Sequence, residues 1–92
     1  MIGKRMLSRH DAVEYLRRKG FHAHSRDWNF GETILVATDY VHVPKGISYY
    51  ERALYIYPKE DYWAIYDPFV TEEHPTCSAL QDAVFEAERR LQ

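Results

Sequence analysis

Histidines form the most specific set of potential metal ligands in this chain. His22 and His24 are two residues apart, and His42 stands between two valines in a later apolar segment. Residues two apart on a β-strand point to the same face, so the three imidazoles would share one face of a sheet if the strands pair in a suitable register. Three imidazole nitrogens with an open fourth position can bind zinc. The favoured alternative, which needs no special register, is a solvated patch whose charge changes near neutral pH.

The cysteine at position 77 could serve as a nucleophile. Cys77 falls near the expected start of the last helix, where the helix dipole favours a thiolate, and His74 is three residues upstream. A cysteine beside a histidine is a nucleophilic arrangement. No orienting acid or oxyanion donor can be named from the sequence, so a structural cysteine is the favoured interpretation. We therefore expect no enzymatic activity.

Tyrosines alternate with apolar residues in the segment from 53 to 67, ALYIYPKEDYWAIYD. In a β-hairpin, this alternation would place one set of apolar residues on one face, Leu54, Ile56, Trp63 and Ile65. The opposite face would carry the tyrosine face, defined as Tyr55, Tyr57, Tyr62 and Tyr66. Tyrosine is enriched at protein interfaces, aromatic rings can stack on unpaired bases, and cross-strand rings can also stabilise a sheet by themselves. Acidic neighbours such as Glu60 and Asp61 favour a protein partner over a nucleic acid.

Basic residues near the N-terminus could contact phosphates. Seven basic and two acidic residues precede position 27, whereas the remainder contains five basic and twelve acidic residues. A nucleic-acid-binding module is therefore the alternative function, and it would use Arg9, Arg17, Arg18 and Lys19. Cations at a helix C-terminus also have a structural reason to be there, because they complement the helix dipole.

A first helix over residues 8–19 would position the basic residues. Ser8 and Asp11 match a capping box, in which the serine hydroxyl accepts from the amide three residues later. Ala12, Val13 and Leu16 follow as an apolar stripe at helical spacing. Gly20 can end the helix in the left-handed conformation.

About four strands are expected between this helix and the last one. One covers residues 21–28 and another 33–43, whose apolar run at 34–37 is typical of a strand buried on both sides or of a local irregularity. Residues 47–52 are expected to be a connection with a short helical turn. The tyrosine hairpin supplies two more strands, with its turn over residues 58–61.

The last helix is expected to run to about Leu91, with Thr76 or Ser78 as its N-cap. Strands joined by short loops are antiparallel, and two terminal helices on one face of such a sheet make two layers. The sequence thus predicts an α+β two-layer sandwich in the order α-β-β-β-β-α. Its sheet has three to four antiparallel strands, and residues 1–92 form a single small domain.

This order of elements resembles the double-stranded-RNA-binding fold, α-β-β-β-α, which small toxins and adaptor modules also use. The last helix here begins TCSALQDAVFEAERR and is acidic in its first turns, where that family has a lysine cluster. The segment AVEYLRRKGFHAH is similar to the start of HicA-type toxins, which resemble RNA cleavers with a histidine in a Gly-Ser-His context. This chain has Asp27-Trp28-Asn29-Phe30 in that region. Neither resemblance therefore implies a function here.

Composition places the chain among ordinary folded proteins. It has 92 residues, 28% charged and 46% hydrophobic, and a net charge of −2. No apolar run approaches the roughly 20 residues of a bilayer span, no signal-peptide core follows the basic N-terminus, and one cysteine cannot form an intrachain disulfide. We expect a cytoplasmic, non-enzymatic binding or regulatory protein without a cofactor. Its partner would be another protein, or a second copy of itself, bound at the tyrosine face.

Overall fold

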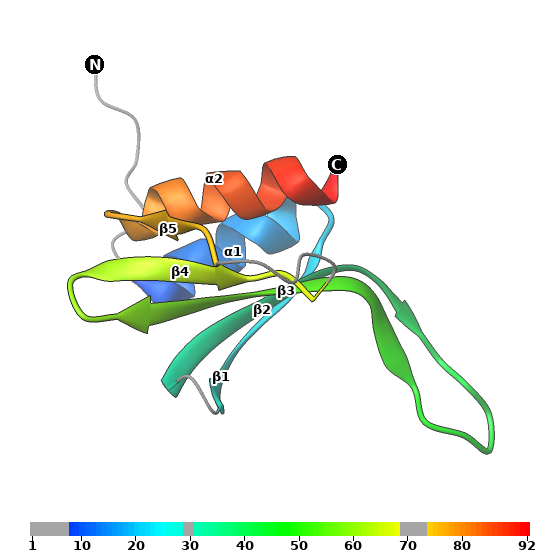
Figure 1. Cartoon of the computed structure of the whole chain (residues 1–92). Helices are drawn as coiled ribbons and strands as arrows, with labels where there is room; N and C mark the ends of the chain where they lie inside the picture. The colour runs from blue at the N-terminus through cyan, green and yellow to red at the C-terminus, as the bar shows by residue number, and fades with distance from the viewer. Residues whose placement is uncertain (1–7, 29–30, 69–73) are drawn as a thin grey trace.

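Two helices cover one face of a five-stranded antiparallel sheet (Figure 1). The structure is a computed structural model, and it describes residues 8–28, 31–68 and 74–92. The helices are α1 (Arg9–Arg18) and α2 (Leu80–Leu91). The strands lie side by side in chain order, and they are β1 (His22–Trp28), β2 (Gly31–Val41), β3 (Tyr49–Lys59), β4 (Tyr62–Tyr66) and β5 (Thr76–Cys77). The predicted α+β architecture is confirmed, with one more strand than expected.

The first helix forms as its capping pattern predicts. The Ser8 hydroxyl accepts from the Asp11 amide at 3.2 Å, and Gly20 follows the helix at a φ of 96°. The stripe of Ala12, Val13 and Leu16 is buried. In the described part of the chain, neither helix has the length and apolar character that a membrane span requires.

The core lies between the helices and one face of the sheet. From β3 and β4 it takes Leu54, Ile56 and Ile65, with Trp63 packed at its margin, so the predicted apolar face of the hairpin is confirmed. The cross-strand pairs from β1 to β3, such as Ala23 with Val36 and Val36 with Leu54, continue this face across the sheet. Helix α2 contributes an apolar stripe of Leu80, Ala83, Val84, Ala87 and Leu91.

The second face of the sheet is also partly buried, although both helices lie on the first (Figure 1). Leu35 and Ala37 are buried but do not belong to the core beneath the helices. Leu35 pairs with His24 on one side and Tyr55 on the other, so rings flank it on this face. Of the two alternatives for residues 34–37, burial on both sides is therefore correct.

The hairpin turn is tighter than predicted. Lys59 pairs with Tyr62, which leaves only Glu60 and Asp61 in the turn, with Glu60 at a φ of 54°. A two-residue turn matches the twist of its strands when its central backbone has a positive φ. Here Glu60, which is not a glycine, adopts that conformation.

The start of the last helix also differs from the prediction. Thr76 and Cys77 pair with β4 as the short strand β5, and the N-cap position is Ala79, which makes no side-chain capping bond. Thr76 and Ser78 are therefore not caps, because the chain is still extended at Thr76 and Cys77.

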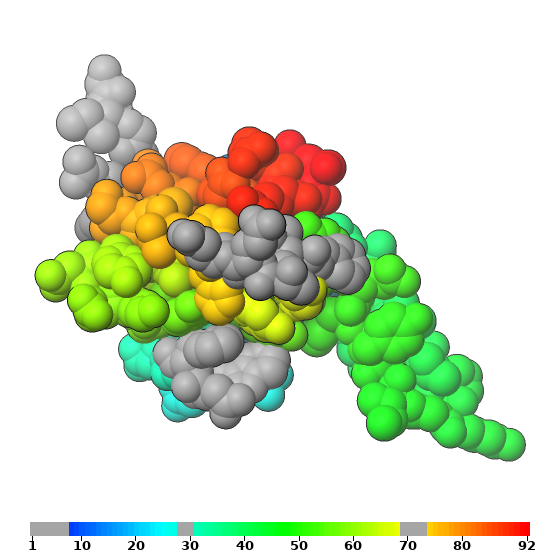
Figure 2. All heavy atoms as spheres, in the orientation of Figure 1, coloured from blue at the N-terminus to red at the C-terminus, as the bar shows by residue number. Residues whose placement is uncertain are grey.

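Strands β2 and β3 extend beyond their neighbours as a two-stranded projection (Figures 1 and 2). Their partners end where His22 pairs with Ala37 and where Tyr66 pairs with Tyr55. Residues 38–52, here called the arm, contain the pairs of β2 and β3 that lie beyond Ala37 and Ala53. The expected connection over residues 47–52 is wrong, because β3 already begins at Tyr49. With the arm, the molecule measures 49 × 29 × 24 Å.

Candidate protein-binding site

The tyrosine face exists, but it is not a free row of phenols. Tyr55 and Tyr66 pair across β3 and β4 with stacked rings whose centroids are 5.7 Å apart. The Tyr57 hydroxyl lies 2.5 Å from Nδ1 of His74, and Tyr57 is only 7% exposed. Tyr62 and Tyr66 are half-buried. The prediction that all four tyrosines form an open contact surface therefore needs correction at Tyr57.

Burial also determines the charge state of this face. Desolvation is the main cause that raises the pKa of Tyr55, with a further contribution from Tyr66. Desolvation likewise raises the pKa of Tyr57, while Lys59 opposes the shift. Both phenols therefore stay neutral at physiological pH, so the face presents apolar rings with polar tips.

The exposed apolar side chains gather on the arm instead. Within the described ranges, four large hydrophobic residues are exposed: Tyr40 (48%), Ile47 (89%), Tyr49 (50%) and Phe85 (43%). The first three belong to the arm, which leaves the body as the green and teal projection in Figure 2. Only Phe85 lies on the body, where its ring packs edge-on against Tyr15.

The tip of the arm is a compact, hydrogen-bonded turn. The Gly46 amide donates to the Val43 carbonyl at 3.2 Å, and the Val43 amide donates to the Ser48 hydroxyl at 3.1 Å. A Cβ on Gly46 would lie 2.7 Å from Cγ1 of Val43, so a larger residue here would displace the Val43 side chain. The turn therefore holds Ile47 at the end of a defined structure.

Left-handed backbone at Arg52 marks the base of the arm. Arg52 has a φ of 38°, in a region that non-glycine residues rarely adopt. Regular alternation from Tyr55 would place Tyr50 on the helix face. Instead, Tyr50 packs against His22 and His24 on the opposite face, with ring centroids 6.0 and 5.8 Å away. The irregularity at Arg52 thus accompanies a change in the direction of the arm's side chains.

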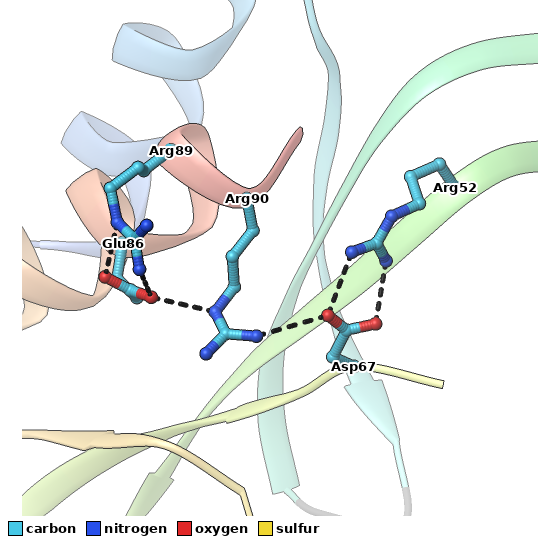
Figure 3. Close-up of polar contacts among 5 residues, drawn as sticks. All are labelled: Arg52, Asp67, Glu86, Arg89 and Arg90. Atoms are coloured by element: carbon cyan, nitrogen blue, oxygen red, sulfur yellow. Dashed lines mark hydrogen bonds and ion pairs between the residues drawn. The ribbon is translucent and has the colours of Figure 1, made fainter. Parts of the chain in front are cut away.

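An ionic network ties this base to the body (Figure 3). Arg52 donates to both carboxylate oxygens of Asp67, at 2.7 and 2.9 Å, and Asp67 is 1% exposed. Arg90 of α2 donates to the same carboxylate at 3.4 Å and to Glu86 at 2.8 Å. The hydrogen bond from Arg89, followed by that from Arg90, lowers the pKa of Glu86 against the effect of its burial. One chain of charges therefore joins β3, the end of β4 and the last turn of α2.

A second attachment lies on the other face of the sheet. The Tyr50 hydroxyl is 2.9 Å from Nε2 of His24, and Nδ1 of His24 is 3.4 Å from Nη2 of Arg17. Arg17 also donates to the Ala23 carbonyl at 2.9 Å. The arm is thus held to α1 and β1 as well as to α2.

The three histidines proposed as zinc ligands are not brought together. His22 and His24 share a face as predicted, but His42 lies on the arm, with Nδ1 3.3 Å from the Ser48 hydroxyl. Among the residues that the structure describes, no three His, Cys, Asp or Glu side chains are grouped to hold a metal ion. The predicted three-histidine arrangement is therefore wrong, because His42 is five residues beyond Ala37, the partner of His22.

Cys77 lies in strand β5 rather than at a helix N-terminus. It is half-buried beside the core, and desolvation, Asp82 and Glu86 all raise the pKa of its thiol. His74 contacts Tyr57 and Tyr66. The less favoured alternative, activation at a helix N-terminus, does not fit this position, because α2 begins three residues after Cys77.

Part of the basic cluster contacts the chain itself. Arg9 donates to Ser25 and forms an ion pair with Glu32 at 2.8 Å. Arg17 is engaged as described above, and the Lys19 ammonium lies 5.5 Å from the centre of the Tyr15 ring. Arg18 is exposed. These contacts give three of the four predicted phosphate-binding residues a structural role.

Comparisons with protein families, curated proteins and solved structures give no match for this chain.

Proposed function

We propose that this protein works by binding another protein chain, and that the arm makes the contact. The proposal rests on one observation: three of the four exposed large hydrophobic residues in the described part of the chain lie on the arm. Exposed aromatic and aliphatic groups that cluster on one projection are typical of interaction sites, whereas scattered ones need no explanation. The half-buried rings of Tyr55 and Tyr66 border the base of this projection and can extend the contact.

The form of the arm supports the same proposal. An isolated two-stranded ribbon is marginally stable in water at best, so packing against a partner would stabilise it. Tyrosines such as Tyr40 and Tyr49 supply large contact area at a small entropic cost. The two attachments at its base would keep these rings in a fixed position before binding, which lowers the entropic cost of association.

A second copy of this chain is the partner that we propose. In a two-fold symmetric contact, the same residues of both chains meet, so the exposed side chains of one arm can face the arm of a second copy. The charges of the arm are balanced, with Asp39 and Glu51 against Lys45 and Arg52, so like charges do not dominate such a contact.

Light scattering after size exclusion tests the proposal directly. Wild type is expected to form a dimer whose fraction rises with concentration, and the double variant Ile47→Ser, Tyr49→Ser is expected to be monomeric. Phe85→Ser is the matched control, because it removes a side chain of similar exposure from the body and should leave the dimer intact. A wild type that remains monomeric at every concentration would contradict self-association. An equal loss of dimer in the arm variant and in Phe85→Ser would contradict the role of the arm.

A further inference from the structure

We infer that His24 is a pH-sensitive latch for the arm. This inference adds regulation to the docking function proposed above and depends on it for its biological meaning. In its neutral form, His24 connects the arm to α1, and protonation of the imidazole breaks that connection.

The two neighbours of His24 determine where its proton lies. A guanidinium group only donates hydrogen bonds, so the ring nitrogen that faces Arg17, Nδ1, has to accept. A neutral imidazole has one acceptor and one donor nitrogen, so the proton is on Nε2. Nε2 therefore donates to the Tyr50 hydroxyl oxygen, 2.9 Å away. A single tautomer thus connects α1, through β1, to the arm.

Protonation removes the acceptor. The second proton would lie on Nδ1 and face the Arg17 guanidinium, so two donors and two positive charges would meet across 3.4 Å. Arg17 is held in place by its hydrogen bond to the Ala23 carbonyl, so the imidazole has to move away. When the ring moves, Nε2 leaves the Tyr50 hydroxyl.

Among the described residues, the other groups named here around His24 bring no negative charge to the imidazolium. On β1, the same-face neighbours are His22 and Arg26, which are basic. On β2, the paired residue is Leu35, and on β3 the contacting group is the phenol of Tyr50. His24 is exposed, so solvent protons reach the ring. Imidazole side chains as a class change charge between pH 5 and 8, so the test below compares two pH values at the ends of that range.

The ionic network at Arg52 and Asp67 would stay closed over that range. The bidentate pair of Arg52 and Asp67 involves no group that ordinarily titrates between pH 5 and 8. Opening the latch would therefore leave the arm attached at Arg52 but no longer held at Tyr50. The expected result is a change in the direction of the arm without unfolding of the body.

Distances between spin labels test this inference in the full chain. One label is placed at Ile47→Cys on the arm and one at Arg18→Cys on α1, with Cys77→Ser as background. At dilution below self-association, we expect a narrow distance distribution at about pH 8 and a broad one at about pH 5. Far-UV circular dichroism at both pH values shows whether the body stays folded.

Three single variants make the test specific. His24→Gln keeps an amide donor for Tyr50 but cannot titrate in this range, so its distribution should be the same at both pH values. His22→Gln, on the same face, should respond like wild type. Tyr50→Phe should already give the broad distribution at about pH 8. An unchanged wild-type distribution, or a pH response that persists in His24→Gln, would overturn the inference.

The outcome can be separated from that of the docking proposal. The label distances are measured on isolated chains, so they report the latch even if no dimer forms. If a dimer does form, acid should weaken it in wild type and leave it unchanged in His24→Gln. A dimer that is insensitive to pH while the distances change would limit the latch to the free chain and contradict its role in regulation.

Discussion

Asp67 is the residue whose role differs most from its appearance in the sequence. It stands before Pro68 at a strand end, a position typical of an exposed turn residue, yet its carboxylate is buried between Arg52 and Arg90. A buried charge is costly unless it is paired, so each arginine stabilises the burial of this carboxylate. Position in the sequence does not reveal this role, because Arg52 lies 15 residues before Asp67 and Arg90 lies 23 residues after it.

The first prediction concerns this carboxylate. Asp67→Asn should lower the free energy of unfolding by about 2–4 kcal/mol, somewhat below the cost of breaking a fully buried pair, because both arginines keep 25% side-chain exposure. Urea denaturation gives the value. Glu86→Gln is the matched control on the same network, and it should cost about 1 kcal/mol or less, since its ion pairs are closer to solvent. Equal costs would show that Asp67 has no special role in the network.

At the scale of elements, the sequence predicted those that nearby residues specify. It did not predict those that become extended only by pairing with another strand. The capping box of Ser8 and Asp11 located α1, because capping depends on residues within one turn. Period-two alternation identified the core face of β3 and β4, because each strand carries its own pattern. Strand β5 has two residues and no pattern of its own, since only its pairing to β4 makes it extended. The arm was missed for the same reason: residues 49–51 are extended through pairing with β2.

The tight turn between β3 and β4 leads to a second prediction. Glu60 adopts a left-handed φ of 54°, which costs a side chain roughly 1 kcal/mol relative to glycine. Glu60→Gly should therefore raise the free energy of unfolding by about 0.5–1 kcal/mol. Asp61→Gly is the matched control in the same turn, where φ is not positive, and it should lower stability. A loss of stability in Glu60→Gly would mean that its side chain contributes more than its backbone costs.

The contact between the two helices provides a third prediction. Tyr15 donates to Glu88 at 2.6 Å, and this hydrogen bond, followed by burial and the charge of Glu88, raises the pKa of Tyr15 from 10.0 to about 12. Because the folded pKa is the higher one, the stabilisation is complete below pH 10 and is lost as the pH rises through about 12.

Urea denaturation over the alkaline range measures this effect. The difference in unfolding free energy between wild type and Tyr15→Phe should shrink from pH 10 to pH 12. In Glu88→Gln, phenolate absorbance should show the pKa of Tyr15 moving back toward its ordinary value. A Tyr15→Phe variant with the same alkaline slope as wild type would contradict this account.

For the whole molecule, we expect body and arm to contribute separately to stability. The core beneath the helices contains no residue from 38–52, so the body should fold without the arm. The sequence pattern did not indicate that Tyr40 and Tyr49 project from the body. That depends on where β1 and β4 end, which is a property of the complete sheet.

Shortening the arm tests this separation. If residues 40–50 are replaced by Asn-Gly, a two-residue turn can join Asp39 to Glu51, which are already paired. The free energy of unfolding should fall by no more than about 1–2 kcal/mol, with a single cooperative transition. Leu54→Ala, just inside the body, should cost about 2–5 kcal/mol. If the shortened chain lost as much unfolding free energy as Leu54→Ala, the arm would be part of the core.

The burial of Leu35 on the face without helices has a further consequence. A helical layer can leave a sheet only when a whole backbone segment moves, together with every contact along it. The rings of His24 and Tyr55, which flank Leu35, are side chains and can each turn about their own bonds while every strand hydrogen bond stays in place. Helices therefore cover one face of this sheet, whereas individual side chains cover Leu35 on the other. The second face can rearrange by side-chain rotation while the fold remains intact.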